Sequence, residues 1–155
     1  MRRAVTVADE AGTRALAGRV AALARKRDVI ALHGALGTGK TAFARGFIAA
    51  RGDAAAEVPS PTFTLAQIYE TSGGVIYHFN LYRLERAEDA FELGIEEAFA
   101  EGISLIEWPE RLGAYLPRER LAITFEPGAG ETERQIALEG FGAWSQRLSE
   151  AALDV

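Results

Sequence analysis

The 155-residue sequence contains no cysteine, which excludes disulfide bonds, thiolate metal sites and catalysis by a thiol. It has two histidines, His33 and His78, too few to build a zinc site from histidine alone. It lacks a run of about eighteen apolar residues, and its first residues do not lead into the apolar core of a signal peptide. We therefore expect a cytoplasmic protein that does not enter a membrane.

Basic residues are outnumbered by acidic ones, and lysine is rare. Two of the seventeen basic residues are lysines, Lys26 and Lys40, and the net charge is −5. Tight autonomous binding to nucleic acid needs a basic face, so we expect any RNA to be reached only indirectly, through a partner. The length and the 48% hydrophobic content predict a single domain over residues 1–155.

A phosphate-binding loop occupies residues 34–41, which match the pattern G-x-x-x-x-G-K-[ST]. An apolar run at 29–32 precedes it, and a helix-compatible segment at 42–51 follows. Glycines let the backbone amides curl around phosphate, and the helix N-terminus adds its positive dipole. The Lys40 ammonium is suited to the β- and γ-phosphates, and the Thr41 hydroxyl is suited to Mg²⁺. The pattern predicts a nucleoside triphosphate site with Mg²⁺ as its metal.

Hydrophobic periodicity predicts alternating strands and helices along the chain. We expect an α/β, three-layer P-loop NTPase-type fold, with a mixed, mainly parallel central sheet and antiparallel hairpin additions. The expected helices cover 9–27, 42–51, 87–100 with an interruption near Gly94, and 142–153. The expected strands are 5–7, 28–33, a hairpin of 63–69 and 75–82, 103–106, and a second hairpin of 120–125 and 135–138.

A phosphate-loop enzyme needs a second polar group beside the metal, usually at the end of a neighbouring apolar strand. Glu107 ends one such strand and Asn80 ends another. An amide cannot serve as a base, so Glu107 is the preferred acid. The alternatives are a surface carboxylate at 107 and a turn-forming amide at 80. Residues 60–62, Ser-Pro-Thr, fit either a triphosphate-sensing switch segment or a plain connector.

Two other features have simpler interpretations. His78 lies within an apolar strand and is interpreted as a hydrogen-bonded core histidine, with a role near the nucleotide as the alternative. Seven carboxylates fall within residues 85–101, which favours a solvated helix face over a docking surface for a basic partner.

Four sequence blocks together resemble one known family. These are the loop at 34–41, SPTFTL at 60–65, YHFNLYRL at 77–84 and EWPERL at 107–112. Their order and spacing are similar to those of the TsaE (YjeE) family, the bacterial ATPase subunit of tRNA threonylcarbamoyladenosine biosynthesis. The resemblance implies a small P-loop ATPase that binds ATP and Mg²⁺. It also implies work with TsaB and TsaD partners, with TsaD carrying the transfer site and ATP hydrolysis resetting the complex.

The resemblance also implies roles for single residues. It places Thr41 and Glu107 on Mg²⁺, with Lys40, Glu107 and Asn80 as the catalytic set. Asn80 departs from the family, whose motif usually has aspartate there, so either Glu107 suffices or hydrolysis is slower. The implied nucleotide contacts are Leu36, Gly37, Thr38, Gly39, Lys40, Thr41, Asn80, Glu110, Arg134 and, near the adenine, Glu10.

Other function classes remain open on the residues alone. A small-molecule P-loop kinase has the right size, although no D-x-D acceptor pair follows the loop strand. A GTPase is disfavoured because the base-reading motif N-K-x-D needs a lysine, and neither Lys26 nor Lys40 lies in such a motif. A weakly hydrolysing nucleotide-binding assembly module is compatible with Asn80.

Overall fold

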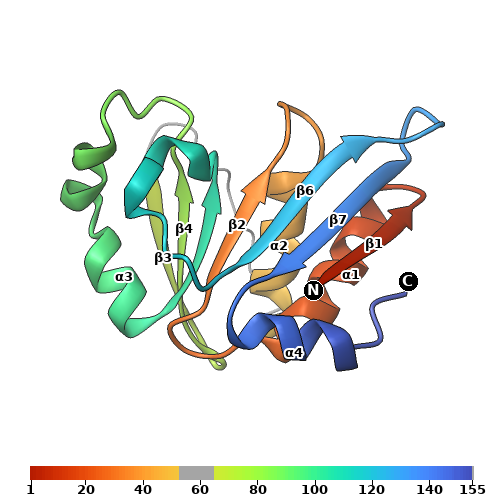
Figure 1. Ribbon diagram of the computed structural model, residues 1–155, viewed down its shortest axis with the longest axis horizontal. Coiled ribbons are helices and arrows are strands. Elements are labelled where there is room, and N and C mark those ends of the chain that lie inside the picture. The colour runs from red at the N-terminus through yellow and green to blue at the C-terminus, as the bar shows by residue number, and fades with distance from the viewer. Residues whose placement is uncertain (53–64, 155) are drawn as a thin grey trace.

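A computed structural model describes residues 1–52 and 65–154 as one seven-stranded sheet with helices around it (Figure 1). The strand order across the sheet is β1-β7-β6-β2-β5-β4-β3. The strands are β1 (Arg2–Val7), β2 (Val29–His33), β3 (Ala66–Thr71), β4 (Gly74–Asn80), β5 (Ile103–Glu107), β6 (Leu121–Pro127) and β7 (Arg134–Gly140).

The sheet is mixed, as predicted. The pairs β6/β2, β2/β5 and β5/β4 are parallel, whereas β1/β7, β7/β6 and β4/β3 are antiparallel. β1, β6, β2, β5 and β4 therefore run in one direction, and β7 and β3 run in the other. Both predicted hairpins are present as the antiparallel pairs β3/β4 and β6/β7. The carboxyl ends of β2, β4 and β5 meet at one edge of the sheet, where sites in α/β folds usually lie.

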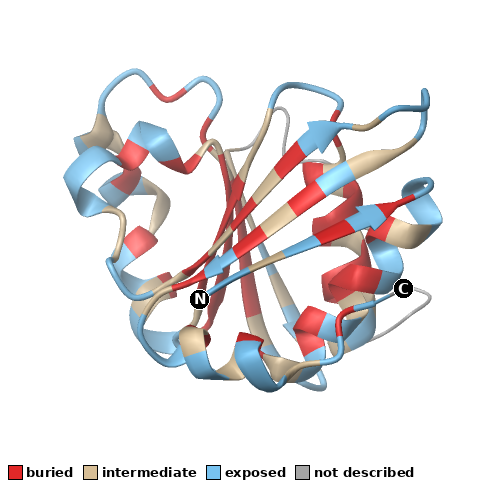
Figure 2. Ribbon diagram, turned by 45° about the vertical axis from the view of Figure 1, so that its right-hand side comes forward, coloured by how far each residue is buried: buried red, intermediate tan, exposed pale blue. Residues whose placement is uncertain are grey.

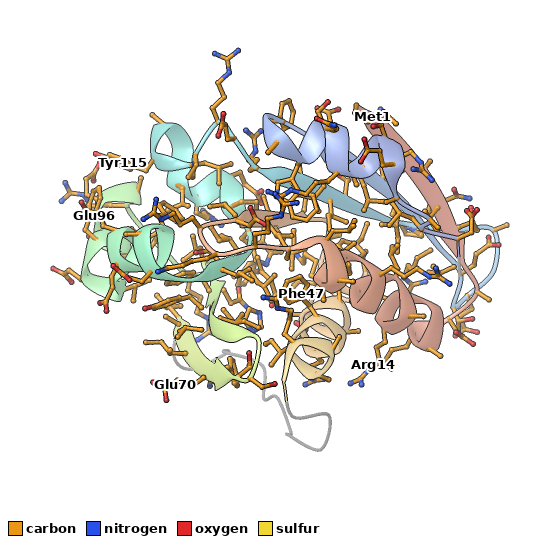
Figure 3. The ribbon with its side chains drawn as sticks, turned by 90° about the horizontal axis from the view of Figure 1, so that it is seen from below. Met1, Arg14, Phe47, Glu70, Glu96 and Tyr115 are labelled. Carbon is orange, nitrogen blue, oxygen red and sulfur yellow. The ribbon has the colours of Figure 1, made fainter. Side chains whose placement is uncertain are left out.

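Helices α1 (Glu10–Leu23) and α2 (Lys40–Arg51) cover one face of the sheet. α1 begins where the Asp9 carboxylate accepts a hydrogen bond of 3.1 Å from the Gly12 amide. Phe47 points from α2 into the core, whereas Arg14 on α1 points outward (Figure 3). The expectation that α1 reaches residue 27 was wrong. The chain turns after Leu23, and Arg27 adopts a left-handed φ of 78° that a helix cannot contain.

The second face carries shorter helices: the 3₁₀ helix η1 (Ala87–Leu93), α3 (Ile95–Glu101) and the 3₁₀ helix η2 (Pro109–Tyr115). The predicted interruption near Gly94 is present, because Gly94 takes a left-handed φ of 83° between η1 and α3. Helix η2 was not predicted. Where this second face is formed by β6, β7 and β1, no described helix covers it. Along these strands, exposed and part-buried residues alternate with buried ones (Figure 2).

Helix α4 (Ala143–Glu150) lies at the opposite end of the sheet from the loop after β2 (Figure 1). It packs through Trp144 and Leu148, and Arg147 makes a two-pronged ion pair with Asp28, with N–O distances of 2.6 and 3.1 Å. The helix predicted over 142–153 is shorter, ending at Glu150. No helix among the described residues is long and apolar enough to cross a membrane.

Candidate functional site

The segment between β2 and α2 has the conformation that its glycines permit. Gly39 precedes α2 with a left-handed φ of 114°, which favours glycine. At Gly34, a β-carbon would lie 2.7 Å from Thr38 Oγ1 and 2.8 Å from the Phe125 carbonyl oxygen, so a larger residue does not fit. Gly39, the N-cap residue of α2, has no side chain that could cap the first amides of the helix. These amides are therefore available to an anion.

A cavity of about 580 Å³ opens in front of this loop, within the range of small-ligand sites. Leu36, Gly37, Thr38, Gly39, Lys40 and Thr41, the predicted contacts of the phosphates, all line it. Asn80, Glu107, Arg134 and Glu10 line it as well, so the fold brings together residues far apart in the chain. The remaining lining residues are Thr13, Ala42, Arg45, Leu65, Tyr82, Arg83, Trp108 and Thr132.

Lys40 is held inside this cavity near acidic side chains but without a direct ion pair to any described residue. Its side chain is buried, its Nζ donates to the Gly34 carbonyl, and Nζ lies 3.7 Å from the centroid of the Trp108 ring. Burial lowers the pKa of the Lys40 ammonium, against the raising effect of the Glu107 and Glu110 charges. A buried cation at a helix N-terminus favours an anionic ligand.

The side chains of Glu107 and Thr41, which both line the cavity, are in hydrogen-bond contact. The Thr41 hydroxyl lies 3.1 Å from one Glu107 carboxylate oxygen and 3.3 Å from the other. Glu107 is 3% exposed, and its second partner is His78, whose Nε2 lies 2.7 Å from Oε2. Asn80 is directly opposite Glu107 in the β4/β5 register, and its Oδ1 accepts from the Tyr82 amide at 3.2 Å. Both predicted strand-end groups are therefore neighbours.

The Thr41 hydroxyl and the Glu107 carboxylate fit Mg²⁺, which prefers hard oxygen ligands. Within residues 1–52 and 65–154, no group of three or more histidine, cysteine or acidic side chains could hold a metal. Mg²⁺ typically keeps several waters and binds one or two protein groups together with substrate phosphates. The two residues therefore suit a metal that arrives with a phosphate ligand.

Arg134 approaches the loop from the start of β7. One guanidinium nitrogen lies 3.4 Å from the Gly37 carbonyl oxygen, and the other donates to the carbonyls of Glu131 and Glu133. Glu10 is on the first turn of α1, 3.9 Å from Arg14. Both positions suit a ligand in the cavity.

Glu110 lies elsewhere. Its carboxylate is 3.3 Å from His33 Nδ1 and does not line the cavity. Burial lowers the pKa of His33, with the Glu110 charge opposing the shift. A contact between Glu110 and a nucleotide stays a prediction, and its present position does not support it. Residues 60–62, predicted as a switch or a connector, lie outside the described residues.

Sequence reasoning did not assign several residues that the fold brings to this site. Arg83 lines the cavity and, within the described part of the chain, has no hydrogen-bond or ion-pair partner. The feature of the sequence that could have pointed to Arg83 is its position three residues after Asn80. His78 was interpreted as a core histidine because its strand is apolar. Its link to Glu107 depends on strand pairing, which the sequence does not display.

A family model described as "Threonylcarbamoyl adenosine biosynthesis protein TsaE" matches residues 7–136 of the chain. The chain belongs to the TsaE family. It is 38% identical over 139 residues to the tRNA threonylcarbamoyladenosine biosynthesis protein TsaE of Bacillus subtilis, covering 89% of this chain and 85% of that relative. It is 39% identical over 118 residues to the TsaE protein of Rickettsia felis, covering 76% and 69%.

The fold is similar to a solved structure as well. The crystal structure of YdiB from Bacillus subtilis matches with a TM-score of 0.80 and 31% sequence identity. The match covers 97% of this chain and 93% of that one. The family resemblance and the fold class predicted from the sequence are therefore confirmed.

Proposed function

We propose that this chain is the ATP-binding and ATP-hydrolysing subunit required for threonylcarbamoyladenosine modification of tRNA beside the anticodon. It acts in the cytoplasm with partners of the TsaB and TsaD type. The observation that carries the proposal is a cavity in a TsaE-family chain that joins a complete phosphate loop to the Thr41 and Glu107 pair. That pairing supports a site for a magnesium-bound nucleoside triphosphate.

Different residues of the chain bind different parts of the nucleotide. The loop amides and the N-terminus of α2 receive the phosphates, and the Lys40 ammonium turns from the Gly34 carbonyl to the β- and γ-phosphate oxygens. Thr41 and Glu107 would hold Mg²⁺, which when bound neutralises charge on the phosphate oxygens. Arg134 and Glu10 lie farther out, where they suit the rest of the nucleotide.

Hydrolysis by this chain alone is expected to be slow. Asn80 is opposite Glu107, where the family motif usually has aspartate, and an amide cannot take a proton from water. An arginine supplied in trans contributes about 10³–10⁵-fold in related phosphoryl-transfer systems. We therefore assign fast turnover to the assembled complex. The Asn80 amide also supports a second candidate, a nucleotide-binding assembly module that hydrolyses little.

The charge of the chain supports indirect action on tRNA. A net charge of −5 disfavours tight binding to a polyanion without help. The side chains of Glu92, Glu96 and Glu97, around η1 and α3, are exposed and add to this effect; Glu96 is labelled in Figure 3. We infer that the partners carry the tRNA and that this chain supplies the nucleotide-dependent step.

The test is ATP turnover by the purified chain alone, with the TsaB and TsaD pair, and with the pair and tRNA, while modified tRNA is assayed in parallel. We expect slow turnover alone, stimulation by the pair, and modification that needs this chain. Capture of the pair should be stronger with ATP than with ADP, because coupling requires different affinities in the two states. Phosphorylation of a small metabolite without partners would instead identify a kinase. Modification without stimulated turnover would favour the assembly module.

A further inference from the structure

His78 is a buried polar residue beside Glu107, one of the two proposed Mg²⁺ ligands. It lies on β4, is fully buried, and places Nε2 2.7 Å from Glu107 Oε2. Its other ring nitrogen, Nδ1, is also buried and has no hydrogen-bond partner in the described part of the chain. The bond to Glu107 is therefore the one hydrogen bond that this imidazole makes there.

The direction of this hydrogen bond follows from the chemistry of the acceptor. We assign the donor role to Nε2, because a carboxylate accepts hydrogen bonds and has no hydrogen to donate. Oε2 of Glu107 is thereby fixed to β4, while Oε1 is the oxygen nearer the Thr41 hydroxyl, at 3.1 Å. The Thr41 hydroxyl also lies 3.3 Å from Oε2, so the hydrogen bond from His78 fixes the position of the carboxylate as a whole beside Thr41.

We propose that His78 is a positioning residue that orients the Glu107 carboxylate toward Thr41 and the metal. The proposal rests on the proposed function, since that function supplies the metal. Partners of metal ligands fix the ligand's orientation, and their loss typically lowers metal affinity or activity by about 10–100-fold. Among the described residues, His78 makes its side-chain hydrogen bond to Glu107 and none to the loop at 34–41, so its effect on the metal acts through Glu107.

A purely structural role for His78 makes different predictions. If the ring only fills the space under Glu107, any replacement of similar volume should preserve the site. If orientation matters, the donor matters, and His78→Gln can place an amide N–H near the position of Nε2 whereas His78→Leu cannot. Ser104→Ala is the matched control, because Ser104 is a buried polar residue on the adjacent strand without a hydrogen-bond partner among the described residues.

The first measurement needs no substitution at His78. Only two histidines exist, so ¹⁵N-histidine labelling gives two imidazole signal sets, and His33→Gln assigns them. We expect the Nε2–H tautomer at His78 in the metal-free protein, with its signals moved by Glu107→Gln. An Nδ1–H tautomer would overturn the proposal.

The second measurement is Mn²⁺ affinity, read by electron paramagnetic resonance in the presence of a non-hydrolysable ATP analogue. We expect His78→Leu to weaken Mn²⁺ binding by about ten-fold or more, His78→Gln to restore most of it, and Ser104→Ala to leave it unchanged. In a Glu107→Gln background, His78→Leu should add no further loss, because both changes remove one interaction. Equal Mn²⁺ affinity in the wild type and in folded His78→Leu, or fully additive losses, would contradict the role. A wild type that binds neither the analogue nor Mn²⁺ would instead contradict the proposed function.

Discussion

The Lys40 ammonium lies 3.7 Å from the centroid of the Trp108 ring, so the phosphate loop is joined to the segment that follows β5. Trp108 adopts a left-handed φ of 59° immediately before Pro109, and the Tyr82 ring packs against it with centroids 4.9 Å apart. A cation over an indole face contributes about 0.5–2 kcal/mol, depending on how far it is removed from water. We expect phosphate bound at Lys40 to compete with this contact.

Trp108 should therefore report nucleotide binding. In a Trp144→Phe variant, Trp108 is the sole tryptophan, and its fluorescence emission should change when ATP and Mg²⁺ are added because Lys40 turns toward the phosphates. The matched control is Trp108→Phe, in which the distant Trp144 should give no response. If emission from Trp108 is the same with and without saturating nucleotide, Lys40 does not leave the ring.

Glu107→Gln separates binding from hydrolysis. The substitution keeps the size of the side chain but removes the charge beside Thr41, so most ATP affinity should remain while turnover falls by about ten-fold or more. Turnover is measured as phosphate release under saturating ATP. The control is Glu101→Gln, an exposed carboxylate whose partner is Lys26, at 3.8 Å. Unchanged turnover in Glu107→Gln would make this carboxylate structural.

Asn80→Asp restores the residue type that the family motif usually has. The Asn80 Oδ1 atom accepts from the Tyr82 amide, and an aspartate can keep that hydrogen bond while adding a charge opposite Glu107. Turnover should rise. The measurement is the same phosphate-release assay, at several Mg²⁺ concentrations. A fall in turnover would mean that the site has adapted around the amide.

The parts of the site that lie close together in the sequence were predictable. The loop at 34–41 follows a buried strand and opens a helix, and its pattern depends on local backbone geometry alone. Asn80 and Glu107 were singled out because each ends an apolar strand, and both line the cavity, while their roles there stay predictions. Their direct opposition was not predictable, since it depends on the β4/β5 register.

The features that were missed depend on contacts between distant residues. Helix α1 ends early because Arg27 turns to donate its amide to the Gly102 carbonyl, 2.8 Å away. Helix η2 begins with Pro109 and contains Gly113, with a non-helical φ of 52°, so its sequence resembles a loop. The bond between His78 and Glu107 spans 29 positions. No local pattern contains that information.

The most direct test of the account is calorimetry of ATP binding to the Lys40→Ala variant at matched Mg²⁺. Lys26→Ala is the control, because Lys26 is the other lysine of the chain and is exposed on the surface. We expect ATP to bind the wild type and Lys26→Ala with the same affinity, GTP to bind more weakly, and Lys40→Ala to show no measurable ATP binding. Equal ATP affinity in the wild type and in folded Lys40→Ala would contradict the assignment of this cavity as the nucleotide site.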